Sequence, residues 1–129
     1  MKKIQTKYSA VGGAHYSPGI VYNGVLYISG QLSIDPETGK KVEGGMKAEA
    51  AQALKNLELV LESAGAKRGD VLQCRAYITD DKLWGEFNEA YIEFFGEHKP
   101  ARAVIPVPVL YYGCQVEIEA VATVEGGQK

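Results

Sequence analysis

Residues 20–29 read IVYNGVLYIS, a stretch in which two short apolar runs flank the dipeptide Asn23-Gly24. Asn-Gly readily supplies the two successive positive φ angles that a two-residue hairpin turn requires. The valine, isoleucine and tyrosine residues on either side favour β-strands. The stretch therefore predicts a β-hairpin that opens the sheet.

Two segments beyond the hairpin have the periodicity of amphipathic helices. In the first, apolar residues recur at three- and four-residue spacing, and Gly65 is placed to end the helix. Its apolar stripe is Met46, Ala50, Ala53, Leu54, Leu57, Val60 and Leu61. In the second, Asp80 or Asp81 can cap the N-terminus, and Gly96 and Pro100 stop the helix. Its stripe is Leu83, Phe87, Ala90, Tyr91 and Phe94.

Three further strands are predicted from alternation and composition. Residues 71–79 alternate, with one face made of Leu72, Cys74, Ala76 and Ile78. Residues 101–109 form one strand, whose two prolines indicate an edge position or a bulge. Residues 115–124 form the last strand, with Glu117 and Glu119 on one face and the small apolar residues on the other. The predicted order is ββαβαββ.

This order predicts a single α+β domain over residues 1–129, a sandwich of a mixed sheet with two helices on one face. Strands such as VLYIS and AVIPV are apolar on both faces, but no third helix remains to cover the second face. A partner subunit would cover it. We therefore expect a homo-oligomer.

Composition and charge restrict the possible partners. The chain has 14 basic and 16 acidic residues, a formal net charge of -2, and no cluster of basic residues, so nucleic acid is not the expected partner. The start, MKKIQTKYSA, lacks the apolar core of a secretory signal, and no apolar stretch is long enough to span a bilayer. We expect a soluble cytoplasmic protein in which Cys74 and Cys114 are buried thiols.

A permanently charged arginine lies in the apolar run KPARAVIPVPV at 99–109, and an unpaired buried charge is costly. One interpretation is a structural pair between Arg102 and Glu117 or Glu119. The other is a site that hydrolyses a small acid, in which the guanidinium holds a carboxylate while a glutamate deprotonates water. Such a site needs no metal or organic cofactor. His15 and His98 lack the neighbouring ligands that would indicate zinc.

Six segments, taken together and in this order, resemble the Rid family of reactive-intermediate deaminases, also called the YjgF family. They are Tyr16, GVLYISGQLSIDPETGK at 24–40, AAQALKNLELVLESAGA at 50–66, FNEAYIEFF at 87–95, KPARA at 99–103 and VEIEAVA at 116–122. The resemblance implies a chorismate-mutase-like fold and a homotrimer with a ligand cleft at each subunit interface. It also implies cofactor-free hydrolysis of 2-imino acids, the enamine/imine products of serine and threonine dehydratases, to 2-keto acids and ammonia.

The resemblance also implies roles for individual residues. Arg102 would bind the substrate carboxylate, Glu117 would orient the water, and Tyr16 would close the pocket from the N-terminal loop. Gly30 and Ser29 would contribute further substrate contacts. Asn88, in the N-x-x-Y of the second helix, is interpreted as a structural residue.

The chain departs from the family pattern at three places. Residues 14–18 read AHYSP, where the family usually has Gly-Pro-Tyr-Ser-Gln. Val104 stands where many deaminases carry cysteine, and Tyr111-Tyr112 follows Leu110 where proline is common. These changes keep the carboxylate-binding arginine but could alter the rim of the pocket, the side-chain preference or the rate.

Two other functions stay open on the sequence. The first is a non-enzymatic binding protein, in which the cleft senses a keto acid or a similar carboxylate and regulates a partner. The second, a ribonuclease or translation inhibitor, follows from older descriptions of family members. It would require contact with RNA, which the acidic balance and the lack of basic clustering oppose.

Overall fold

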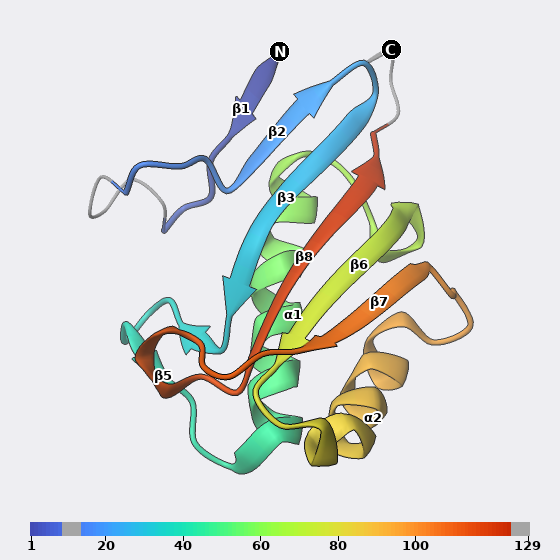
Figure 1. Cartoon of the computed structure of the whole chain (residues 1–129). Coiled ribbons are helices and arrows are strands. Elements are labelled where there is room, and N and C mark those ends of the chain that lie inside the picture. Colours follow the sequence, from blue (N-terminus) through green and yellow to red (C-terminus); the bar gives the residue numbers. More distant parts are fainter. Residues whose placement is uncertain (9–13, 125–129) are drawn as a thin grey trace.

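The computed structural model describes residues 1–8 and 14–124 (Figure 1). Its strands are β1 (Lys2–Ile4), β2 (Gly19–Tyr22), β3 (Val25–Leu32), β4 (Ile34–Asp35), β5 (Lys40–Lys41), β6 (Val71–Ile78), β7 (Ala101–Pro106) and β8 (Val116–Thr123). The helices are α1 (Gly45–Ser63) and α2 (Trp84–Phe95), and the 3₁₀ turns are η1 (Arg68–Asp70), η2 (Asp81–Leu83) and η3 (Tyr111–Gly113).

Six strands form a mixed sheet in the order β1-β2-β3-β8-β6-β7, and β4 and β5 form a separate two-stranded ribbon. The β6–β7 pair is parallel, and the other pairs are antiparallel. In Figure 1, α1 lies behind β8 and β6, and α2 packs beside it on the same side of the sheet. The predicted α+β class, with two helices on one face of a mixed sheet, is confirmed.

The predicted hairpin is present, but it does not open the sheet. Asn23 and Gly24 have φ angles of 51° and 77°, as a tight turn between β2 and β3 requires. The short strand β1 pairs with the outer edge of β2. Sequence analysis missed β1 because its residues are Lys-Lys-Ile and only Ile4 is buried, so the segment has almost no apolar pattern.

The core lies between the helices and the sheet. All seven predicted apolar positions of α1 are buried, and the helix ends at Ser63, two residues before Gly65, whose φ is 78°. The sheet contributes the inward side chains of β8, which alternate without interruption: Val116, Ile118, Ala120 and Ala122. From α2, Phe87, Ala90, Tyr91 and Phe95 are buried, whereas Phe94 of α2 and Leu83 of η2 pack against the core partly exposed.

Two strand predictions need correction. Leu72 was assigned to the buried face of β6, but it is 48% exposed because the pairing of β6 with β8 shifts between Val71 and Gln73, so that Val71 is the buried residue. The strand predicted over 101–109 ends at Pro106. Proline lacks the N–H that a ladder needs, and β7 is an edge strand of the sheet, as the prolines indicated.

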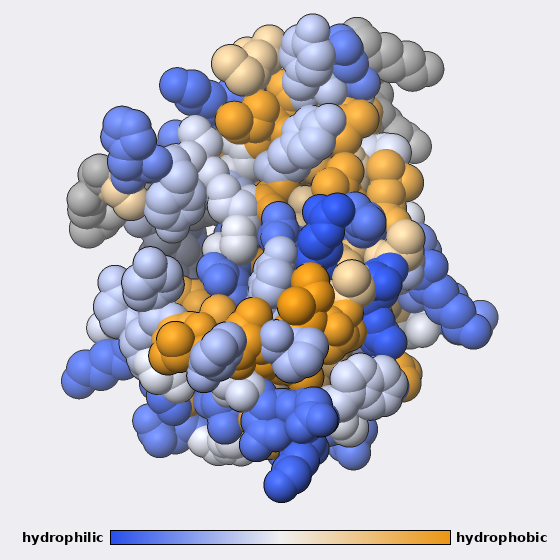
Figure 2. Space-filling view, in the orientation of Figure 1, coloured by the Kyte–Doolittle hydropathy of each residue, from blue (hydrophilic) through white to orange (hydrophobic). Residues whose placement is uncertain are grey.

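The second face of the sheet carries no helix in the part of the chain that the structure describes. Figure 2, in the orientation of Figure 1, shows apolar and charged residues side by side on this open face. Tyr27 on β3 is 51% exposed and is paired with the half-buried Val121 on β8. The open face is the feature from which the homo-oligomer was predicted.

Candidate functional site

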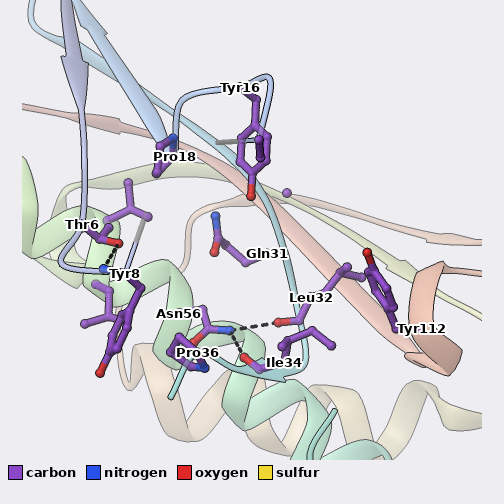
Figure 3. Close-up of a pocket in the computed structure, with 14 residues that line it drawn as sticks. Thr6, Tyr8, Tyr16, Pro18, Gln31, Leu32, Ile34, Pro36, Asn56 and Tyr112 are labelled. Carbon is purple, nitrogen blue, oxygen red and sulfur yellow. Dashed lines mark hydrogen bonds between the residues drawn. The ribbon is translucent and has the colours of Figure 1, made fainter. Parts of the chain in front are cut away.

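A pocket of about 330 Å³ lies beside the second half of β3 (Figure 3). The pairing of β2 with β3 ends at Ile28, so the next residues of β3 pair only with β8. Their other edge faces the N-terminal segment and α1, and the pocket occupies this space. Tyr16 and Gly30, both predicted as site residues, are among the residues that line it.

Ser29 holds the segment that carries Tyr16. Its hydroxyl donates to the carbonyl of Ser17 at 2.7 Å, and its backbone N–H donates to the carbonyl of Pro18 at 2.9 Å. Tyr16 itself is 64% exposed, and in Figure 3 its hydroxyl points toward Gln31 at the centre of the pocket. The backbone next to Tyr16 is therefore held by Ser29, and the tyrosine ring lies exposed at the rim of the pocket.

The carboxylate of Glu117 lies against Gly30. A Cβ atom added at Gly30 would be only 2.6 Å from Oε2 of Glu117 and 3.0 Å from its Cδ. The pairing of β3 with β8 is irregular between Ile28 and Gln31, which is where this contact forms. The carboxylate of Glu117 therefore occupies the space that a side chain at position 30 would need. The structure thus brings Gly30, Glu117, Ser29 and the Tyr16 segment into one region.

Burial raises the pKa of Glu117, and the nearby carboxylate of Glu119 raises it further. Glu119 is itself engaged, because the hydroxyl of Tyr77 donates a hydrogen bond to it. This hydrogen bond is the main cause of the raised pKa of Tyr77. Of the two glutamates on this face, Glu119 is thus bound by Tyr77, and Glu117 is the one whose proton affinity is increased, as a general base requires.

Arg102 lies elsewhere. It is opposite Cys74 in the parallel β6–β7 pair, and Cys74 is opposite Ala120 of β8, so all three residues are on the face that the helices cover. Glu117 projects from the other face, and β6 separates its strand from β7. Within one chain, the structural pair between Arg102 and a glutamate is therefore not formed, and that interpretation is wrong for a single copy.

Three residues of α2 hold the guanidinium of Arg102 instead. Its Nη1 donates to Oδ1 of Asn88 at 2.8 Å, and its central carbon lies 4.8 Å from the ring centroid of Tyr91 and 5.5 Å from that of Trp84. The positions 84, 88 and 91 are one turn apart and share one face of the helix. Asn88 thus contacts a predicted site residue. The spacing of Trp84, Asn88 and Tyr91 along the helix is the sequence feature that could have predicted this contact. The arginine is oriented and its end stays accessible.

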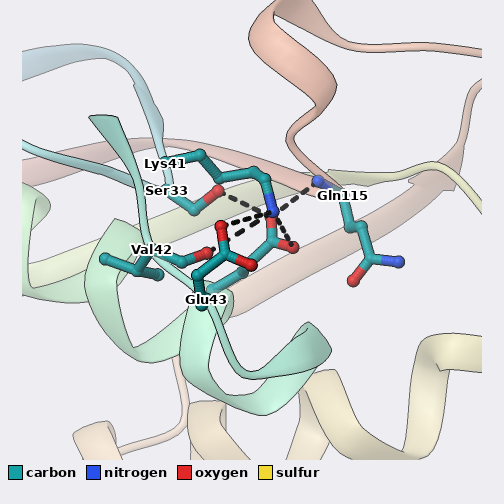
Figure 4. A network of polar contacts seen from close by, with 6 residues as sticks. Ser33, Lys41, Val42, Glu43 and Gln115 are labelled. Atoms are coloured by element: carbon teal, nitrogen blue, oxygen red, sulfur yellow. Dashed lines mark hydrogen bonds and ion pairs between the residues drawn. The ribbon is translucent and has the colours of Figure 1, made fainter. Parts of the chain in front are cut away.

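A buried acid that sequence analysis missed joins three parts of the fold (Figure 4). Glu49 of α1 is 2% exposed and accepts hydrogen bonds from the hydroxyl of Ser33 at 2.7 Å and from the backbone N–H of Gln115 at 2.8 Å. The Nζ of Lys41 lies 3.7 Å from its other oxygen. These contacts fix the start of β8, two residues before Glu117.

Asn56 of α1 forms part of the pocket floor, and sequence analysis missed it as well. Its Nδ2 donates to the carbonyls of Leu32 and Ile34, at 3.0 and 2.8 Å (Figure 3). These carbonyls belong to the end of β3 and to β4, where no strand pairs with them on that side. The amide therefore replaces ladder hydrogen bonds and fixes the pocket wall to the helix.

Both cysteines are free and buried, as predicted, and burial raises the pKa of the Cys74 thiol to about 11. Over residues 1–8 and 14–124, no three His, Cys, Asp or Glu side chains are grouped as ligands for a metal ion. In the same described part, neither helix combines the length and the apolar character that crossing a membrane requires.

Comparison with known proteins identifies the family. The sequence pattern described as Endoribonuclease L-PSP matches residues 7–124, and the chain therefore belongs to this family, the Rid or YjgF family. A RutC family protein of Aquifex aeolicus is 44% identical, over 95% of this chain and 98% of its own length. The 2-iminobutanoate/2-iminopropanoate deaminase of Mus musculus is 39% identical, over 94% of this chain and 90% of its own length.

Solved structures agree with the fold. The crystal structure of RidA from an Antarctic Psychrobacter bacterium matches with a TM-score of 0.89 and 35% identity, over 96% of this chain and all of that one. The structure of E. coli TdcF with bound serine matches with a TM-score of 0.89 and 29% identity, over 97% of this chain and all of that one. The resemblance found in the sequence is thus confirmed for family and fold.

Proposed function

We propose that this protein is a cytoplasmic hydrolytic deaminase that converts small 2-imino acids, the enamine/imine products of serine and threonine dehydratases, to 2-keto acids and ammonia. The observation that carries the proposal is the 37–39% identity, over 94% of the chain, to mammalian proteins named for this activity. Removal of such reactive intermediates would limit damage to other metabolites and enzymes.

The active site in this proposal is composite. Glu117, Gly30 and Tyr16 lie together in one chain, whereas Arg102 projects from the other face of the sheet at its far edge. A second copy must therefore bring its arginine to the glutamate of the first. A homotrimer with one cleft at each interface would do so, and the open sheet face offers the surface for assembly.

The chemistry needs one bound carboxylate and one oriented water. Arg102, held by Asn88, presents the donors that match a carboxylate. Glu117 takes a proton from water as the oxygen attacks the imine carbon, and delivers that proton to the nitrogen. It then takes the hydroxyl proton of the carbinolamine and returns it to the same nitrogen, so that the C–N bond breaks, ammonia leaves and the keto group forms.

The remaining residues position these groups. Tyr16 covers the cleft from the N-terminal segment, which Ser29 holds, and the backbone of Gly30 borders the bound substrate. No metal or organic cofactor takes part in these steps, because imines already react with water slowly and orientation supplies the acceleration.

The test couples threonine dehydratase to this protein and measures 2-ketobutyrate formation with semicarbazide present as a trap for the imine. We expect the wild type to accelerate keto-acid formation and Arg102→Ala to lower the acceleration at least about a hundredfold, because the carboxylate loses its charged partner.

The matched control is Arg68→Ala. Arg68 also stacks on an aromatic ring, at 4.1 Å from Phe94, and is hydrogen-bonded, but it lies outside the candidate site. Turnover by Arg102→Ala close to that of the wild type would reject the proposal, provided that light scattering shows the same assembly for both.

A ligand-binding function is the second candidate, and the structure of TdcF with bound serine favours it. Such a protein would bind a keto acid through Arg102 and leave the imine untouched. A folded, assembled wild type that binds 2-ketobutyrate in calorimetry and gives no acceleration in the coupled assay would support this function over the deaminase.

A further inference from the structure

Tyr112 has an unusual backbone conformation at the rim of the pocket beside β3. Its φ and ψ angles are 62° and 23°, in the left-handed region that is unfavourable for a bulky residue. Its side chain is among those that line the pocket. Tyr112 and the adjacent Tyr111 are similarly exposed, at 78% and 75%, but Tyr111 is not among the lining residues. The backbone conformation thus gives the pocket one ring of the Tyr111-Tyr112 pair.

Two other tyrosines and an aliphatic wall line the same pocket. In Figure 3, Tyr8 and Tyr112 lie at opposite ends, and Tyr16 points toward the space between them. Leu59 and Val60 of α1 supply the aliphatic wall. Ring faces and aliphatic groups favour an apolar or aromatic ligand group. Among the described residues that line the pocket there is no lysine or arginine, so the pocket is suited to a side chain and not to a carboxylate.

The size of the pocket indicates the size of that side chain. A volume of about 330 Å³ is at the lower end of the range of pockets that bury drug-sized ligands, about 300–1,000 Å³. The ethyl group of 2-iminobutanoate would leave most of this space without contacts, and unfilled apolar space forfeits dispersion attraction. A phenyl, indole or branched aliphatic group would fill much more of it.

We propose that this pocket receives the side chain of the 2-imino acid, and that Tyr112 gives the enzyme a preference for aromatic and large apolar side chains. The inference rests on the proposed deaminase function and leaves its chemistry unchanged. The geometric link is Gly30, which lines the pocket and contacts the carboxylate of Glu117. A side chain in the pocket therefore places the imine carbon at the β3 edge near that glutamate.

The test compares two imino acids. An L-amino-acid oxidase acting on phenylalanine, with catalase to remove peroxide, supplies the aromatic imino acid, and threonine dehydratase supplies 2-iminobutanoate. The quantity measured is the ratio of kcat/KM for the aromatic imino acid to kcat/KM for 2-iminobutanoate. We expect a ratio above one for the wild type and about a tenfold lower ratio for Tyr112→Ala, because one aromatic wall is lost.

Three variants serve as controls. Tyr112→Phe keeps the ring and is expected to keep the ratio, and Tyr111→Ala removes the neighbouring ring outside the pocket and is expected to leave the ratio as in the wild type. Tyr112→Gly removes the ring and also relieves the positive φ, so it tests the ring even where Tyr112→Ala fails to fold.

The outcomes separate the two proposals. Hydrolysis of 2-iminobutanoate with a wild-type ratio below one, or the same ratio in Tyr112→Gly as in the wild type, would overturn the inference and leave the deaminase function intact. An equal fall in Tyr111→Ala would also overturn it. Hydrolysis of neither imino acid by the wild type would reject the deaminase function itself.

Discussion

At the scale of single residues, Gly30 determines where the carboxylate of Glu117 lies. In Gly30→Ala the new methyl group would be 2.6 Å from Oε2, a separation that only a displaced glutamate can relieve. The backbone of Gly30 does not have a positive φ, so alanine is compatible with its conformation and the variant is expected to fold. We expect a fall in kcat of about tenfold or more, with little loss of stability, in the imine assay.

The pH dependence of the same variant reports on the cause. Burial and Glu119 raise the pKa of Glu117, so the wild type loses its base form, and its kcat/KM, at a higher pH than an ordinary glutamate would. A carboxylate displaced toward solvent loses part of this shift. The acidic limb of the profile should therefore move to lower pH in Gly30→Ala. An unmoved limb would show that Glu117 is not the titrating base. Gly69→Ala, at a position with open space around it, is the matched control.

Arg102 shows at the same scale what the sequence could and could not predict. Its presence in an apolar run predicted that the charge is either paired or used to bind a ligand, since an unpaired buried charge is costly. The partners were not predictable by alternation along strands, because they come from α2, which packs over the β7 edge of the sheet. Asn88, interpreted from the sequence as a structural residue of the second helix, is one of these partners.

At the scale of elements, the local signals in the sequence were the reliable ones. The Asn23-Gly24 turn and the apolar stripe of α1 are properties of adjacent residues, and both are confirmed. The strand β1 and the shift at Leu72 depend on pairing between distant segments, which periodicity along one segment does not encode. The same limit concealed the contact between Gly30 and Glu117, which forms where the pairing of two strands is irregular.

Glu49 connects elements, and its removal is expected to destabilise the fold. In Glu49→Ala the hydroxyl of Ser33 and the N–H of Gln115 lose their acceptor in a buried site, and Lys41 loses its buried partner. We expect a loss of about 2–4 kcal/mol in the free energy of unfolding, measured by urea denaturation.

Glu43→Ala is the matched control for Glu49→Ala. Glu43 is the other carboxylate beside Lys41, at 4.0 Å, but its side chain is 92% exposed, so its removal should cost less than about 1 kcal/mol. Equal losses in the two variants would show that the buried network does not contribute as argued.

At the scale of the whole molecule, we expect the open sheet face to be the surface through which copies of the chain assemble. Tyr27, 51% exposed, lies on β3 in the middle of this face, whereas Ile92, 56% exposed, lies on α2 in the helical layer. We expect light scattering to give a trimer for the wild type and for Ile92→Lys, and a smaller species for Tyr27→Lys, because a charge on a closing apolar surface is costly. An intact trimer in Tyr27→Lys would exclude this face as the interface.

Loss of assembly in Tyr27→Lys should be accompanied by loss of imine hydrolysis if the site is composite. A monomer that retains full turnover would place the arginine and glutamate of the active site in one chain, contrary to their positions on opposite faces of the sheet.

The opposite projection of Arg102 and Glu117 has a consequence for how activity depends on the amount of protein. Under the proposed composite site, a folded monomer is inactive. It carries both Arg102 and Glu117, but the two side chains cannot meet within one chain. Specific activity would then fall on dilution below the concentration at which copies associate. In a cell, the total rate of imine hydrolysis would rise more steeply than the concentration of the chain while most chains are monomeric. It would rise in direct proportion to that concentration once all chains are assembled.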